Sequence, residues 1–257
     1  MNKIRAVLGM GFAAVLANSA VNAQTVTEES IESRFQLDFH VPDAALQKFI
    51  PAGWDVTIAT SGAAKDCNVR VIFIDRVSVN GPDGKVIGAG ANQIVYLTVP
   101  VKKTASGAAA QMVIAGLSAD AKDVPGPFGV YMQATDHKMN RATAAGKGAG
   151  IVEEQTWQFS AAGGEHVETF VKYERVPAQR NKRDTTYVSA ADPKIVQVAR
   201  IDNSINIARN ATIDVTDRVK EFRYKIGGGR LAALFDGTEK VLSVDIFPWS
   251  NLAITPQ

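Results

Sequence analysis

Cysteine is nearly absent from this chain, because Cys67 is the only one among its 257 residues. A single cysteine excludes an internal disulfide, so the fold has to be held together by its apolar core. We expect Cys67 to be a buried apolar side chain rather than a bridge to a second chain. Histidines are also few and widely spaced, and neither a metal-ligand motif nor a Gly-x-Ser-x-Gly motif occurs. No metal and no cofactor are therefore expected.

Long apolar runs are missing as well. The longest covers residues 6–17 and is too short for a membrane-spanning helix, which needs about 20 residues. It follows Lys3 and Arg5, and small residues stand three and one positions before a cleavage site after Ala23. This order is typical of a secretory signal peptide. We therefore predict a cleavable signal peptide over residues 1–23, and a periplasmic or secreted protein.

An excess of charge of one sign is absent once the signal peptide is removed. The signal peptide carries two of the 28 basic residues and no acidic residue, so 26 basic residues remain against 26 acidic ones. A neutral surface gives no electrostatic reason to expect nucleic acid as a partner. Two kinds of partner remain: a small organic molecule and, in a homo-oligomer, a second copy of the chain. No membrane span is expected.

The sequence does contain many short β-type segments separated by turn residues. Residues 34–40 alternate apolar and polar side chains, as in a half-buried strand. Further runs rich in β-branched and aromatic residues follow at 69–79, 94–101, 111–117, 128–135, 155–159, 165–175, 195–207, 212–226 and 241–246. Helical patterns are few, at 43–50, 136–145 and 230–235. We predict one mostly β domain over residues 24–257, with its antiparallel sheet closed into a barrel or packed as a sandwich.

Four segments, in their order along the chain, resemble the acetoacetate decarboxylase superfamily. They are Asp43–Gly53, Tyr96–Val101, Val130–Met132 with Asp136, and Gly229–Asp236 followed by Val241–Ser243. The resemblance implies a closed antiparallel β-barrel-like fold of the acetoacetate decarboxylase type, with a small-molecule cavity inside and often an oligomeric assembly.

The resemblance also implies a chemistry that this sequence does not support. Active members carry a Schiff-base lysine and a neighbouring lysine in a motif that reads roughly Gly/Ala-aromatic-Pro-Lys-Lys. The best match here begins at Gly150 and places Glu153 and Glu154 at the two lysine positions. A carboxylate cannot form an imine. The catalytic glutamate of the family is also missing, since Gln93 or Ile94 stands at its position.

We therefore expect an exported protein that binds a small carboxylate or ketone in a barrel cavity without Schiff-base chemistry. Its candidate ligand-binding residues are Gln93, Arg34, Tyr131, Lys147 and Trp157. The alternative is a divergent decarboxylase-like lyase that uses Glu153 and Glu154 as acid and base. Adjacent residues on a strand point to opposite faces, so only one of the two would enter the cavity. A structural protein with a filled barrel is the third possibility.

Overall fold

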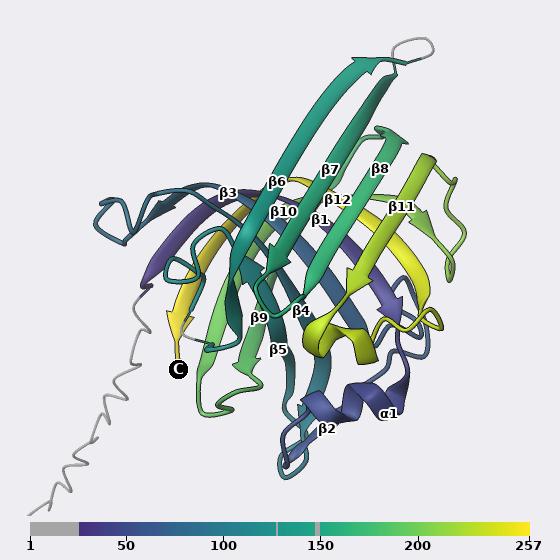
Figure 1. The fold of residues 1–257 in the computed structure, drawn as a ribbon. Helices are drawn as coiled ribbons and strands as arrows, with labels where there is room; N and C mark the ends of the chain where they lie inside the picture. Colours follow the sequence, from purple (N-terminus) through teal and green to yellow (C-terminus); the bar gives the residue numbers. More distant parts are fainter. Residues whose placement is uncertain (1–25, 127, 147–149) are drawn as a thin grey trace, which may run out of the picture.

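The computed structural model describes residues 26–126, 128–146 and 150–257. The predicted signal peptide over residues 1–23 and the candidate ligand residue Lys147 lie outside the described residues. Strands make up most of the structure (Figure 1). Within the described residues they are β1 (Glu28–His40), β2 (Trp54–Val56), β3 (Val69–Asn80), β4 (Asn92–Lys103), β5 (Ala109–Ser118), β6 (Tyr131–Ala145), β7 (Ile151–Ala161), β8 (His166–Glu174), β9 (Gln179–Ser189), β10 (Val196–Asn210), β11 (Val219–Gly227) and β12 (Lys240–Pro256). None of the helices in these parts of the chain is long and apolar enough to cross a membrane.

Seven strands close into a barrel in the order β5, β9, β10, β12, β1, β3, β4 and back to β5. Six of the pairings are antiparallel. The seventh joins β5 and β9 in parallel over Gln111–Val113, so the barrel is mixed. The predicted mostly β, closed barrel-like fold is confirmed, with this one parallel pair added.

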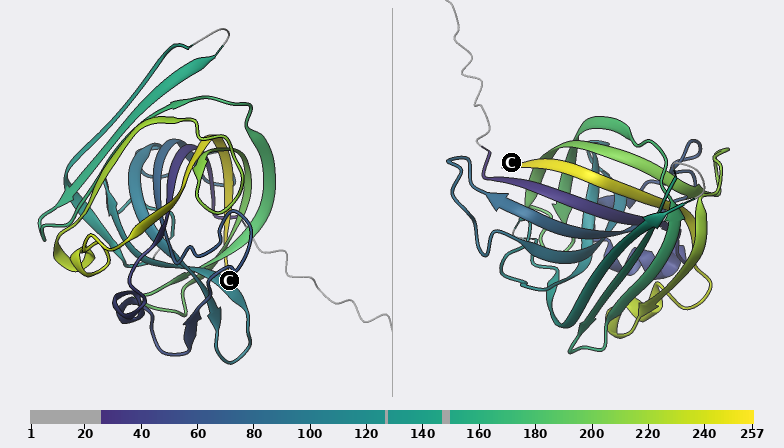
Figure 2. Two further views of the ribbon diagram at one scale, coloured as in Figure 1. Left: turned by 90° about the vertical axis from the view of Figure 1, so that its right-hand side faces the viewer. Right: turned by 90° about the horizontal axis from the view of Figure 1, so that it is seen from above.

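A second sheet of β6, β7, β8 and β11 lies along one side of the barrel (Figure 2). It continues from the barrel because β6 pairs in parallel with the end of β5. The main apolar core fills the space between the outer face of the barrel and this sheet. Phe35 and Phe73 of the barrel meet Trp157 of β7 there, and all three side chains are fully buried.

The polar side of β1 points into the barrel rather than into solvent. Phe35, Leu37 and Phe39 belong to the core outside the barrel. The intervening Arg34 and Asp38 therefore point to the opposite face of the strand. They are only 4% and 3% exposed, respectively. The alternation predicted for residues 34–40 is correct, but both faces of the strand are buried.

The helical predictions have mixed outcomes. The segment predicted at 43–50 is found as α1 (Asp43–Leu46) followed by the 3₁₀ helix η1 (Gln47–Phe49). The segment predicted at 230–235 forms only a 3₁₀ helix, η2 (Gly229–Ala233). The helix predicted at 136–145 is wrong, because these residues pair with β7 as part of β6. Pairing with a neighbouring strand outweighs the helix preference of its alanines.

Candidate functional site

A cavity of about 30 Å³ lies inside the barrel. Arg34, Tyr96, Tyr131, Tyr187, Pro125 and Phe128 are among the residues that line it. A buried water needs roughly 10–15 Å³ by this kind of measure, so the closed cavity has room for about two waters. A larger occupant requires part of the wall to move.

Arg34 places a permanent positive charge in the middle of the barrel. Its Nε donates to Glu32 Oε2 at 2.7 Å, and its Nη2 lies 2.5 Å from the same oxygen. Burial acts to lower the pKa of Arg34, but the Glu32 carboxylate more than offsets this and holds the pKa above its ordinary value. The guanidinium therefore stays charged. Among the described residues no hydrogen bond uses Nη1, which leaves donors for a ligand.

Three tyrosines share the cavity with Arg34. The rings of Tyr96 and Tyr131 meet edge to face with their centroids 6.5 Å apart. Burial raises the pKa of both phenols, so their hydroxyls stay neutral and can donate hydrogen bonds to a ligand oxygen. Tyr187 lines the same cavity from β9. Within the described residues, none of the three hydroxyls has a hydrogen-bond partner.

The barrel also contains buried polar atoms that no described group satisfies. Asn203 of β10 and Ser250 of β12 are cross-strand neighbours, and both are fully buried. The Asn203 amide and the Ser250 hydroxyl have no hydrogen-bond partner, nor has Thr98 Oγ1 or Gln111 Oε1. A buried polar atom left without a partner costs about 1–3 kcal/mol. These atoms indicate that the interior is suited to a polar occupant, either water or a ligand.

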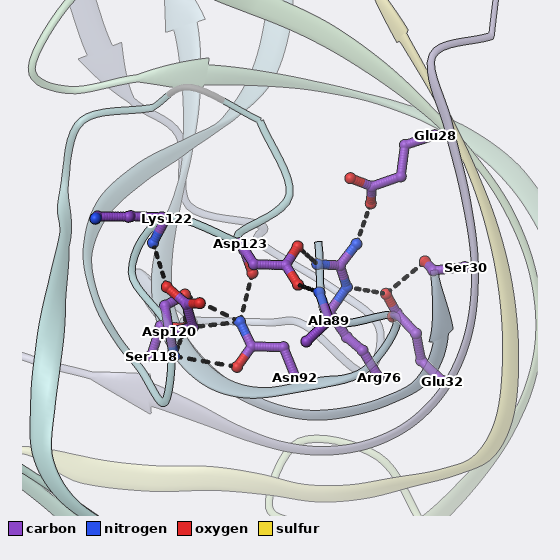
Figure 3. Close-up of polar contacts among 10 residues, drawn as sticks. All are labelled: Glu28, Ser30, Glu32, Arg76, Ala89, Asn92, Ser118, Asp120, Lys122 and Asp123. Atoms are coloured by element: carbon purple, nitrogen blue, oxygen red, sulfur yellow. Dashed lines mark hydrogen bonds and ion pairs between the residues drawn. The ribbon is translucent and has the colours of Figure 1, made fainter. Parts of the chain in front are cut away.

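One end of the barrel is held by Arg76, which is fully buried. Figure 3 shows its guanidinium among the carboxylates of Glu28, Glu32 and Asp123. Its Nε lies 3.6 Å from Glu32 Oε1, and its Nη1 lies 3.8 Å from Asp123 Oδ1. Glu32 therefore interacts with Arg76 and Arg34 at once, which fixes the position of Arg34.

The connection between β5 and β6 lies over this end of the barrel. Of this connection, residues 119–126 and 128–130 are described. Asn92 anchors it by donating to Ser118 Oγ at 2.9 Å and to the carbonyl oxygens of Asp120 and Asp123 (Figure 3). The Ala89 N–H donates to Asp123 Oδ2 at 3.2 Å. The same connection brings Pro125 and Phe128 to the cavity wall.

The structure brings together two of the predicted ligand residues, Arg34 and Tyr131, at the cavity. Trp157 instead lies in the core between the two layers, where its Nε1 donates to Gln155 Oε1 at 3.1 Å. Gln93 is partly buried and donates to Asp75 Oδ1 at 3.4 Å, away from the cavity lining.

Glu153 and Glu154 point to opposite faces of β7. Glu153 is 2% exposed, forms ion pairs with Arg141 at 3.2 Å and with Arg175, and accepts a hydrogen bond from Gln155. Glu154 lies on the outer face and pairs with Lys172 at 2.6 Å. Neither carboxylate lines the barrel cavity. Their predicted acid/base role stays a prediction.

Sequence reasoning did not identify Tyr96, Tyr187, Asn203 or Ser250 as site residues. Each lies on a different strand of the barrel, and they share an interior only because the sheet closes. No local spacing connects them. Among the described residues, no group of three or more His, Cys, Asp or Glu side chains is arranged to hold a metal ion.

No protein-family model matches the chain, and no curated protein matches it by sequence. Solved structures do match it by fold. The enduracididine biosynthesis enzyme MppR, in a complex with HEPES buffer, is 12% identical with a TM-score of 0.53, and the match covers 98% of both chains. Acetoacetate decarboxylase from Legionella pneumophila is 12% identical with a TM-score of 0.53, over 95% of this chain and 92% of that one.

An acetoacetate decarboxylase-like enzyme from Sphingomonas wittichii matches at 12% identity and a TM-score of 0.50, over 90% and 92% of the two chains. The chain therefore has the acetoacetate decarboxylase type of fold, as the resemblance of its sequence segments implied. At this level of identity the likeness establishes the fold alone.

Proposed function

We propose that this protein binds a small organic carboxylate or keto acid inside its barrel. The observation that carries the proposal is the charged guanidinium of Arg34, which is enclosed in the barrel. No hydrogen bond among the described residues uses its Nη1 donors. A carboxylate is the natural partner of a planar guanidinium. The hydroxyls of Tyr131 and Tyr187 supply hydrogen-bond donors for a second ligand oxygen.

Buried polar atoms without a described partner favour ligand binding over a purely structural barrel. An interior that served only for stability would be filled by apolar side chains that leave no polar atom without a partner. Here Asn203 and Ser250 are buried without partners. Because the cavity is small, a ligand larger than about two waters requires part of the cavity wall to move.

The structural neighbours agree with this ligand class. One structure of the enzyme MppR is described as a complex with pyruvate, a small keto acid, and matches this chain at 11% identity with a TM-score of 0.52 over 91% of each chain. A Schiff-base reaction would need a lysine at the ligand, and the residues that line the cavity include none. We therefore favour binding over decarboxylation. The alternative of a divergent lyase would require Glu153, now held by two arginines, to act on a ligand elsewhere.

Isothermal titration with pyruvate and acetoacetate tests the binding site. We expect Arg34→Met to weaken binding by more than tenfold, because a hydrogen bond to a charged group contributes about 1.5–3 kcal/mol. Tyr187→Phe removes only a hydroxyl and should weaken binding with little change in stability. Arg200→Met, at an exposed position of β10, is the matched control. Unchanged binding in Tyr187→Phe and in a folded Arg34→Met would contradict the proposal. So would a lysine adduct trapped by borohydride.

We further propose that the protein is exported and begins at Gln24. The sequence order of residues 1–23 supports this proposal. Expression of the full chain in a bacterium, followed by N-terminal sequencing of the periplasmic fraction, tests it. A full-length chain retained in the cytoplasm would contradict it.

A further inference from the structure

Two buried carboxylates face each other at the end of the barrel away from Arg76. Asp38 of β1 lies six residues beyond Glu32, a separation of about 20 Å along a strand. Gln36 Nε2 donates to Asp38 Oδ1 at 2.7 Å and lies 3.5 Å from Asp245 Oδ2. Ser243 Oγ donates to Asp245 Oδ1 at 2.7 Å. The two aspartates are therefore linked through one amide.

Among the described residues, one cation is paired with Asp38 and Asp245. Arg70 Nε lies 3.4 Å from Asp38 Oδ1, and no described cation forms an ion pair with Asp245. Asp38 and Asp245 are 3% and 6% exposed. Burial raises the pKa of Asp38. Burial, together with the charge of Asp38, raises the pKa of Asp245 to about 7. The pair therefore binds a proton near neutral pH.

A surface pocket of about 250 Å³ reaches Arg70 from outside. Its other walls are mostly apolar and include Ile58, Ala64, Cys67 and Pro100. Arg70 is the one charged residue in this lining, and its side chain is 26% exposed. The pocket is smaller than the roughly 300–1,000 Å³ of sites for drug-sized ligands. It therefore combines apolar walls with a single positive charge.

We propose that this pocket is a second ligand site, which binds a small monocarboxylate with an apolar tail on Arg70 and takes up a proton on the Asp38–Asp245 pair behind it. The apolar walls take the tail, and the guanidinium takes the carboxylate. A dianion such as phosphate is disfavoured, because two aspartates lie behind the only cation. The site is separate from the barrel cavity, whose lining includes neither Arg70 nor Cys67.

Proton uptake follows from competition for Arg70. A bound carboxylate adds a negative charge beside Asp38 and draws on the guanidinium that now stabilises it, so the pair binds its proton more tightly. By linkage, protonation of the pair must strengthen ligand binding to the same extent. The other titratable groups near Arg70 do not account for this proton uptake. Burial and then the charge of Asp38 raise the pKa of the Cys67 thiol to about 12. Arg183 of β9 keeps its charge near neutral pH, although burial lowers its pKa from the high ordinary value of arginine.

Titration calorimetry with butyrate at pH 7.5, in two buffers with different heats of ionisation, tests the proposal. We expect binding with net uptake of a proton, and an affinity that falls by up to tenfold per pH unit above pH 7. Phosphate should not bind. Asp245→Asn should still bind butyrate but lose more than half of the proton uptake. Arg70→Met should abolish the butyrate binding that is coupled to proton uptake.

Ile58→Trp tests the pocket independently, in case the Arg70→Met variant does not fold. Ile58 is a 36% exposed pocket wall outside the ion-pair network, so a bulky side chain there should block the pocket in a folded protein. Val86→Trp, at a 66% exposed position, is the matched control. The proposal fails if butyrate does not bind, if Ile58→Trp binds it normally, or if no proton is taken up. Arg34→Met should leave butyrate binding at this pocket intact, so failure here and failure of the barrel site are distinguishable.

Discussion

Arg34, Gln36 and Asp38 lie on one face of β1, and each is at most 9% exposed. Each is stabilised by a different partner: Arg34 by Glu32, Gln36 by Asp38, and Asp38 by Arg70. Buried charges are tolerated only when they are paired or when they give up their charge. Among the described residues, no cation forms an ion pair with Asp245. Burial and the charge of Asp38 raise the pKa of Asp245 to about 7.

This pKa predicts a particular dependence of stability on pH. The folded-state pKa of Asp245 is raised, so its stabilising contribution is complete at low pH and is lost as the pH rises through about 7. Asp245→Asn should remove that loss. Because one pKa unit corresponds to about 1.4 kcal/mol, we expect the free energy of unfolding of wild type to fall relative to the variant by about 3 kcal/mol between pH 5 and pH 8. Urea unfolding of both proteins at four pH values measures this difference. Parallel pH profiles of wild type and Asp245→Asn would contradict the prediction.

At the scale of elements, the connection from β5 to β6 is held in place by side chains rather than by regular structure. Asn92 bonds its backbone, and Arg76 attracts Asp123. Arg76 also neutralises Glu28, whose pKa is raised by burial despite the arginine. One side chain of β3 thus ties β1 and the connection together at the mouth of the barrel.

Arg76→Met should be strongly destabilising, because it leaves Glu28, Glu32 and Asp123 without their common cation. Removal of one partner from a buried ion pair costs about 3–5 kcal/mol. Urea unfolding at pH 7 measures the loss. Lys85→Met removes an exposed pair with Asp83 and should cause no measurable change. Equal stability of the two variants would show that Arg76 does not hold the barrel mouth.

At the scale of the whole molecule, the apolar core joins the two layers. Phe35 and Phe73 from the barrel meet Trp157 from the second sheet. The barrel interior contains smaller apolar clusters, and among them it also carries Arg34, three tyrosines and buried polar atoms without a described partner. The largest apolar core and the proposed ligand site are therefore located in different places. The barrel can use its interior for a ligand because its outer face supplies the core.

Trp157→Ala should weaken the packing between the barrel and the second sheet and so lower the free energy of unfolding. Truncation of a fully buried tryptophan costs about 3–5 kcal/mol, which should lower the midpoint of urea unfolding. Trp249 is 38% exposed, and Trp249→Ala is the control, with an expected loss below about 1 kcal/mol. A small effect at Trp157 would contradict its assignment to the core and would support the earlier expectation that it contacts a ligand.

Much of the fold was accessible from the sequence, but not all of its strands. The alternation at 34–40 and the β-branched runs predicted six of the seven barrel strands, and the segment resemblance gave the fold type. β9 was missed because Gln179–Asp184 is almost entirely polar. Its identity as a strand depends on pairing with β10, which no local pattern shows. The burial expected for Cys67 is confirmed at 2% exposure.

The sequence by itself determined which residues of each strand share a face, because side chains alternate along extended backbone. It also determined that no disulfide and no Schiff-base lysine motif is present. Only the tertiary structure decided that the polar face of β1 is the inside of a closed barrel, that Arg34 and Tyr131 meet there, and that Trp157 does not. The physical reason is closure: each interior residue comes from a separate strand, and their distances depend on register and curvature that a linear sequence does not display.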